Sequence, residues 1–164
     1  MSTLENGREI TFGEAVKEAL IEEMHRDSHV FIIGEDVAEA GTVFKVLTGL
    51  LDEFGPDRVI DSPISEAGIT GIGVGAAVTG MRPVVDIMFG DFTTLAMDQM
   101  VNQAAKTHYM SGGKLRVPMV IRTTMGAGRR SAAQHSQSLH AWYSHVPGLK
   151  VAIPSTPYDA KGLM

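Results

Sequence analysis

One acidic side chain stands where a carboxylate is energetically costly. Glu66 lies in residues 62–68 (SPISEAG), directly after a predicted strand and at the start of a predicted glycine-rich helix. Residues 69–80 are apolar or small except for two threonines, so this helix is predicted to be buried. An unpaired charge is disfavoured in such surroundings. We therefore expect the Glu66 carboxylate to meet a partner there.

A second polar cluster contains His135, within residues 134–137 (QHSQ), and follows the glycine-containing segment 125–130 (MGAGRR). This cluster comes after a predicted strand, and open parallel sheets bind ligands at the carboxyl ends of their strands. Histidine titrates near neutral pH and therefore suits proton transfer. Taken alone, His135 would equally suit a hydrogen-bonded structural role, so both interpretations stay open.

Other candidate sites are less convincing. A Gly-x-Gly pair at Gly71 and Gly73 suggests a dinucleotide loop, but Ala76 follows in place of the third glycine and the glycines lie inside the predicted helix. Glycine destabilises a helix, so repeated glycines favour close packing of this segment against another helix, within the domain or across a subunit boundary. We prefer this interface role to nucleotide binding.

Zinc and serine-hydrolase chemistry are not supported. His140 and His145 have no third ligand at a recognisable spacing, and Ser136 does not lie in a Gly-x-Ser-x-Gly segment. The pair Arg129-Arg130 could contact an anionic substrate or belong to a solvated loop, and the loop is slightly preferred.

Composition narrows the function classes. The 164 residues are 44% hydrophobic and 20% charged, which fits one globular domain with a sizeable core. The formal charge of -5, with 14 basic residues against 19 acidic ones and no basic stripe, argues against nucleic acid as a partner. The absence of cysteine excludes disulfides and thiol chemistry. No secretory leader or membrane-spanning apolar run is recognisable, so we expect a cytoplasmic protein without a membrane partner.

Helical and strand patterns alternate along the chain. Helices are predicted over residues 11–26 and 43–54, from residue 65, over 93–110 and from 157, and strands over 29–33, 59–60, 83–88, 117–122 and 149–153. Repeated strand-helix units predict an α/β fold of three layers, with a mostly parallel sheet between helices. The chain ends a few residues into its last predicted helix, so we expect a further C-terminal portion.

Many short motifs occur together and in order along essentially the whole chain. They are residues 10–15 (ITFGEA), 34–37 (GEDV), 62–68, 89–92 (FGDF), 98–99 (DQ), 111–113 (SGG), 134–137, 147–150 (PGLK) and 157–163 (PYDAKGL). Together they resemble the E1 β subunit of thiamine-diphosphate-dependent 2-oxo acid dehydrogenases of the pyruvate or acetoin type. The resemblance implies that residues 1–164 form a transketolase-like pyrimidine-binding domain, without the family's C-terminal domain.

The resemblance also assigns roles to individual residues. Glu66 matches the glutamate that hydrogen-bonds N1′ of the cofactor's aminopyrimidine. Phe92 matches the aromatic residue that packs on the pyrimidine ring, although it would also suit an ordinary core. His135 matches the active-site histidine that stabilises or protonates intermediates and helps to receive the lipoyl group.

The implied enzyme is an oxidoreductase built as an α₂β₂ heterotetramer. The Gly-Asp-Gly segment and downstream asparagine that hold magnesium and the diphosphate do not occur here, and in these enzymes they belong to the α subunit. Thiamine diphosphate would thus be shared, with magnesium carried by the α subunit and no metal site in this chain. A 2-oxo acid would be decarboxylated, or acetoin cleaved, and the acyl group passed to lipoamide on the E2 acyltransferase. Residues 122–135 look closer to pyruvate and acetoin enzymes than to branched-chain ones.

Two other functions stay open at this point. One is half of another transketolase-superfamily enzyme, which would act on phosphorylated ketoses. The other is a non-catalytic, truncated module for assembly or dimerisation.

Overall fold

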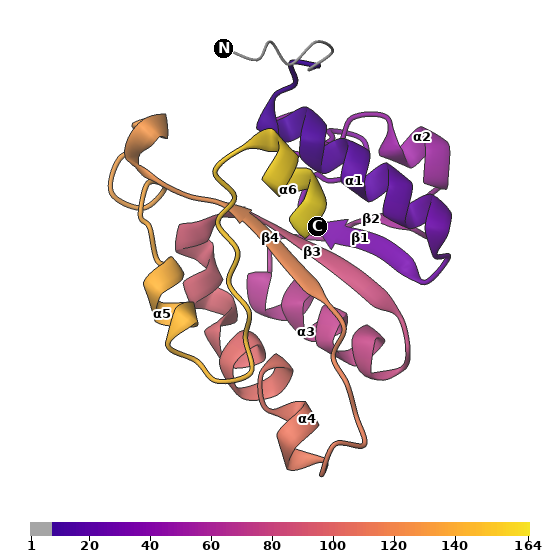
Figure 1. The fold of residues 1–164 in the computed structure, drawn as a ribbon, viewed down its shortest axis with the longest axis vertical. Helices are drawn as coiled ribbons and strands as arrows, with labels where there is room; N and C mark the ends of the chain where they lie inside the picture. The colour runs from indigo at the N-terminus through magenta and orange to yellow at the C-terminus, as the bar shows by residue number, and fades with distance from the viewer. Residues whose placement is uncertain (1–7) are drawn as a thin grey trace, which may run out of the picture.

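A four-stranded parallel sheet forms the centre of the computed structural model, which describes residues 8–164 (Figure 1). Its strand order is β2-β1-β3-β4. The strands are β1 (Val30–Gly34), β2 (Val59–Asp61), β3 (Arg82–Phe89) and β4 (Val120–Thr124). All three neighbouring pairs are parallel, so the carboxyl ends of the strands meet at one edge of the sheet.

Helical segments cover both faces of this sheet (Figure 1). One face carries α1 (Phe12–Arg26), α2 (Leu50–Phe54) and α6 (Pro157–Leu163). The other face carries α3 (Glu66–Val78), the 3₁₀ segment η1 (Gly90–Ala96), the π-helical segment η2 (Gln99–Ala104) and α5 (His140–Ser144), and α4 (Thr107–Met110) packs against η2. The predicted three-layer α/β fold is confirmed.

Two hydrophobic clusters join the layers. Leu20 of α1 packs with Ile32 of β1 on one face, and Ile69 of α3 packs with Val85 of β3 on the other. Every residue of β1 is buried, as expected of a parallel strand covered on both sides. No helix in residues 8–164 is long and apolar enough to cross a bilayer.

The predicted first helix is confirmed by its N-terminal cap. The Thr11 hydroxyl accepts from the Glu14 backbone amide at 3.2 Å, and the Glu14 carboxylate accepts from the Thr11 amide at 2.7 Å. This reciprocal pairing satisfies two amides that the first turn leaves free.

Two predicted helices are shorter or more irregular than expected. The helix predicted over 43–54 is confined to Leu50–Phe54, because Lys45 and Gly49 have positive φ angles of 59° and 89°. The helix predicted over 93–110 is divided into η1, η2 and α4. The Thr93 and Thr94 hydroxyls donate to the carbonyls three residues earlier, and such bonds compete with regular helical pairing.

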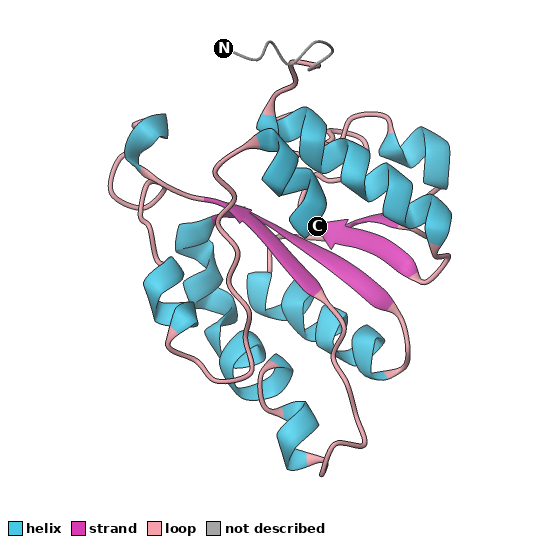
Figure 2. Cartoon of the chain, viewed as in Figure 1, coloured by secondary structure: helices cyan, strands magenta, loops and turns pink. Residues whose placement is uncertain are grey.

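Of the last two predicted strands, one is present with shifted bounds and one is wrong. The strand predicted over 117–122 lies a few residues later, at Val120–Thr124. The strand predicted over 149–153 is wrong, because these residues form a loop between α5 and α6 (Figure 2). Val151 and Ile153 are residue types that favour strands. Strand propensity alone, however, does not provide a neighbouring strand for the segment to pair with.

The glycines of α3 serve different purposes. A Cβ atom at Gly73 would lie 2.6 Å from Val85 Cγ2 and 3.1 Å from Met119 Cε, so this glycine lets α3 approach the sheet. The close contact at Gly73 is therefore with β3, whereas α3 also packs against the helical segments η1 and η2, as the repeated glycines predict for packing within the domain. A Cβ atom at Gly75 would meet no atom within 4 Å.

These two glycines make a matched test of the packing. We expect Gly73→Ala to lower the free energy of unfolding by about 1–3 kcal/mol, because the added methyl overpacks the contact with β3. Gly75→Ala should raise it by about 0.5–1 kcal/mol, because alanine is the better helix former. Urea unfolding of both variants measures the difference. Equal effects would contradict the described packing of α3.

Candidate active site

Glu66 is the first residue of α3, five residues after Asp61 at the end of β2. The preceding Ser65 caps the helix, with its hydroxyl accepting from the Gly68 amide at 3.2 Å. Glu66 is only 7% exposed, and it takes part in none of the ion pairs found within residues 8–164. The free amides of a helix N-terminus stabilise a carboxylate there. The fold thus buries this acid, as the sequence predicts. The partner that the sequence led us to expect is not a basic side chain of residues 8–164.

A second buried acid, Glu35, lies beside it. Glu35 follows β1, whose last residue Gly34 pairs with Asp61 at the end of β2, so the two strand exits are neighbours. Its side-chain Oε1 is buried and has no hydrogen-bond partner in the described part of the chain. Burial, and next the charge of Glu66, raise the pKa of Glu35, while the Ser65 backbone amide opposes the shift. The surroundings of Glu35 therefore favour its protonated form more than water does.

Sequence reasoning missed Glu35 as a site residue. The available signal was an acid directly after a fully apolar strand, in residues 30–35 (VFIIGE). Its neighbour could be recognised only after the strand order placed β1 beside β2.

Phe92 and His135 come together in an aromatic cluster (Phe44, Phe89, Phe92 and His135). The rings of Phe92 and His135 have centroids 5.0 Å apart and an interplanar angle of 79°. Phe89 contacts both rings, with centroid distances of 5.7 Å to Phe92 and 4.6 Å to His135, and Phe44 lies 5.5 Å from Phe89. Edge-to-face contacts of this kind fix ring orientations.

The segment that carries His135 leaves the carboxyl end of β4 and is here called the His135 loop (residues 125–138). The Gly126 amide donates to the Gln137 carbonyl at 3.3 Å, and the Ser131 amide donates to the Ser136 hydroxyl at 3.0 Å. The Arg129 guanidinium lies 3.5 Å from the centroid of the Phe44 ring. Arg129 therefore stacks on the aromatic cluster. Arg129 and Arg130 are both exposed in this loop, in line with the preference for a solvated loop.

All candidate residues occupy one edge of the sheet. Glu35 follows β1, Glu66 follows β2, Phe92 follows β3 and His135 follows β4. The helix that begins with Glu66 also packs against η1, which contains Phe92. The described contacts join Phe92 to His135, but they join Glu66 to neither.

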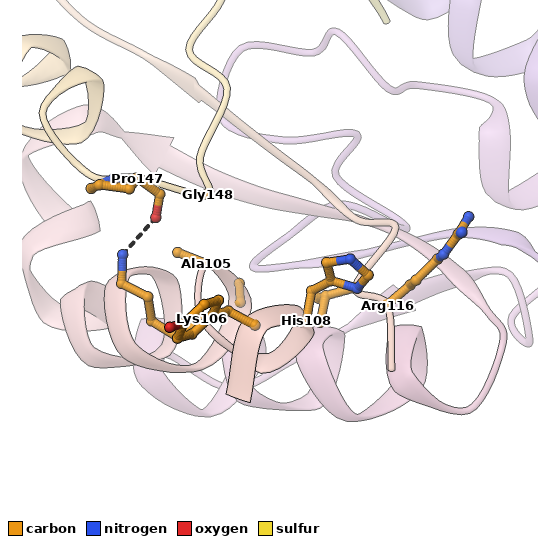
Figure 3. A pocket seen from close by; sticks show the side chains of 9 residues that line it. Ala105, Lys106, His108, Arg116, Pro147 and Gly148 are labelled. Atoms are coloured by element: carbon orange, nitrogen blue, oxygen red, sulfur yellow. Dashed lines mark hydrogen bonds between the residues drawn. The ribbon is translucent and has the colours of Figure 1, made fainter. Parts of the chain in front are cut away.

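A basic cavity of about 730 Å³ lies elsewhere (Figure 3). It is lined in part by Lys106, His108 and Arg116, and Lys106 Nζ donates to the Pro147 carbonyl at 2.5 Å. Arg116 precedes β4, so this cavity lies toward the amino end of that strand. It contains none of the candidate residues. Within residues 8–164, moreover, no three histidine, aspartate or glutamate side chains are grouped to hold a metal ion.

A family model described as the transketolase pyrimidine-binding domain matches residues 8–164. The chain belongs to this family. A pyruvate dehydrogenase E1 component subunit beta from Rickettsia conorii is 55% identical over 156 residues, which cover 95% of this chain and 48% of that protein. The subunit beta of an acetoin:2,6-dichlorophenolindophenol oxidoreductase from Bacillus subtilis is 50% identical, over 96% of this chain and 49% of that protein.

The likeness extends to a further substrate class and to a solved structure. The 2-oxoisovalerate dehydrogenase subunit beta of Bacillus subtilis is 46% identical, over 94% of this chain and 47% of that protein. The structure of a split-gene transketolase, described as an inactive β4 tetramer, superimposes with a TM-score of 0.74 at 18% identity, covering 95% of this chain and 47% of that one. The last match shows the fold alone. The chain spans about half the length of most of these relatives.

The raised pKa of Glu35 predicts a pH-dependent effect on stability. The protonated form is favoured in the folded chain, so its contribution is present below the ordinary pKa and is lost as the pH rises through the raised value. We expect Glu35→Gln to be more stable than the parent at about pH 7.5 and nearly equal to it at about pH 4. Urea unfolding at both pH values measures this.

Glu39→Gln is the matched control, because Glu39 is exposed and close in sequence. It should show no such difference. A Glu35→Gln chain that is less stable than the parent at the higher pH would contradict the proposed burial cost of this carboxylate.

Proposed function

We propose that this chain is the pyrimidine-binding part of the β subunit of a thiamine-diphosphate-dependent E1 component. With an α subunit, it would decarboxylate a 2-oxo acid such as pyruvate, or cleave acetoin, and pass the acyl group to lipoamide. The observation that carries the proposal is the buried Glu66 carboxylate without a basic partner, at the sheet edge that also holds Phe92 and His135. The three β subunits that resemble the chain support the substrate class.

The residues at this edge fit the pyrimidine half of the cofactor. A carboxylate with no basic partner suits a ring nitrogen that carries or accepts a proton, and an aromatic ring suits the flat face of a heterocycle. Two buried carboxylates would repel an anionic diphosphate. We therefore assign the diphosphate and its magnesium ion to the α subunit, so that the cofactor is shared.

Each residue then has a distinct task. Glu66 holds a proton at N1′ of the pyrimidine. The neighbouring Glu35 has a pKa raised by burial and by the charge of Glu66, so its protonated form is favoured beside the cofactor. Phe92 fixes the orientation of the ring. His135 lies against Phe92 and supplies or accepts a proton at the substrate. Thiamine diphosphate, when bound, supplies the carbon nucleophile that takes up the acyl group.

The larger assembly follows from the same proposal. We place the chain in an α₂β₂ heterotetramer that delivers acyl groups to an E2 lipoyl acyltransferase, and we place that complex in the cytoplasm. The relatives named as β subunits support an α partner. The choice between pyruvate and acetoin stays a prediction for activity measurements.

Glu66→Gln tests the central role. In the enzyme reconstituted with an α subunit, we expect thiamine-dependent turnover of pyruvate or acetoin to fall at least about 100-fold, because glutamine does not share a proton as a carboxylate does. The variant should stay folded, with a thermal unfolding temperature no lower than that of the parent, because the substitution removes the repulsion with Glu35. Glu39→Gln, which changes an exposed acid, should keep full turnover.

Three outcomes would contradict the proposal. Full activity of Glu66→Gln would remove its assigned role. Turnover of phosphorylated ketoses, in place of 2-oxo acids, would indicate half of another transketolase-superfamily enzyme. A stable homo-oligomer that responds to neither an α subunit nor thiamine diphosphate would indicate a non-catalytic assembly module.

A further inference from the structure

A buried carboxylate next to Phe92 holds the His135 loop. Asp91 lies in η1 and is only 4% exposed. Its Oδ1 accepts two hydrogen bonds from Gln137, one from the backbone amide at 3.2 Å and one from the side-chain Nε2 at 2.7 Å. Hydrogen bonds to an ionised acceptor are about twice as strong as those between neutral groups.

Gln137 is also the residue at which the loop closes. Its carbonyl accepts from the Gly126 amide at 3.3 Å, while its amide and side chain are held by Asp91. The two ends of the loop are therefore tied to each other and to η1 at one point. His135 lies only two residues before that point.

Asp91 and Phe92, which are neighbours in η1, contact two different parts of the His135 loop. Phe92 contacts the imidazole ring of His135, and Asp91 binds the backbone two residues further along. The His135 ring and the Gln137 backbone are thus both held by η1. No basic side chain within residues 8–164 forms an ion pair with Asp91, and its Oδ2 has no hydrogen-bond partner there. The two hydrogen bonds from Gln137 therefore offset the free-energy cost of burying the Asp91 carboxylate.

We propose that Asp91 is a positioning residue that fixes the location of His135 through Gln137. The catalytic importance of that location rests on the function proposed above for His135. A carboxylate accepts hydrogen bonds and does not donate them, so it selects one arrangement of the two Gln137 donors. Without it, the loop would keep its internal bonds but lose its attachment to η1.

Hydrogen exchange of the chain tests the attachment without any assay of activity. In Asp91→Ala, we expect backbone exchange in residues 126–137 to become roughly tenfold faster, because the loop then opens locally. Acylation of His135 by diethyl pyrocarbonate, followed by mass spectrometry, should accelerate to a similar extent. Asp91→Asn keeps a carbonyl oxygen in the same place and should restore both rates to within about threefold of the parent.

Two further variants distinguish a local loosening of the loop from a general loss of structure. Gln137→Ala removes the side-chain donor from an exposed position, and it should loosen the same segment even where Asp91→Ala does not fold. Asp98→Ala is the matched control, because the Asp98 carboxylate binds Asn102 and Gln103 and has no bond to the loop. It should leave both rates in residues 126–137 unchanged.

Kinetics of the enzyme reconstituted with an α subunit give an independent readout. We expect Asp91→Ala to lower kcat about tenfold with little change in the KM for thiamine diphosphate, since Glu66 and Phe92 are untouched, and Asp91→Asn to restore most of the rate. The inference would be overturned if Gln137→Ala showed the same exchange and acylation rates as the parent, and if any folded Asp91→Ala chain did so as well. Full turnover of His135→Ala would instead contradict the proposed function and leave the loop measurements to decide the role of Asp91.

Discussion

The repulsion between two buried carboxylates, Glu35 and Glu66, is the constraint on which the candidate site depends. The parallel register of β1 and β2 brings both acids to the same edge of the sheet, and the helical layers on both faces keep water away. Burial and the neighbouring charge raise the pKa of Glu35, which favours the protonated form of that side chain. An edge of this kind attracts a protonated heterocycle and repels an anion, which is why the proposal gives the anionic end of the cofactor to another chain.

The other half of the site is held by contacts to an irregular segment. η1 is a 3₁₀ helix, and it directs Asp91 and Phe92 to the same loop. Tyr143 of α5 donates to the Thr93 hydroxyl at 2.5 Å, and burial raises the pKa of the Tyr143 phenol. The segment after the His135 loop is thereby tied to η1 as well. Asp91, Phe92 and Thr93 of this irregular segment thus each hold a different part of the chain near His135.

Local signals in the sequence were enough for the fold and for part of the site. The capping box at Thr11, the apolar strand before Glu35 and the acid opening a glycine-rich helix each depend on neighbouring residues, and each was recognisable. The partnership of Glu35 with Glu66 depends on strand order, and that of Asp91 with Gln137 spans 46 positions in the chain. Neither follows from periodicity. The failed strand at 149–153 shows the same limit, because pairing needs a neighbour that composition does not specify.

A buried acid elsewhere in the chain shows that the lack of a basic partner at Glu66 is not a general property of this fold. Asp86 of β3 lies opposite Arg122 of β4 in the parallel register, and the two side chains form a buried ion pair. Burial raises the pKa of Asp86, while Arg122 opposes the shift. A carboxylate with such a partner has a structural role, because removing the partner would leave a buried charge uncompensated. Glu66 has no such partner among residues 8–164, and a carboxylate that is not committed to an ion pair is what its proposed role toward a ring nitrogen requires.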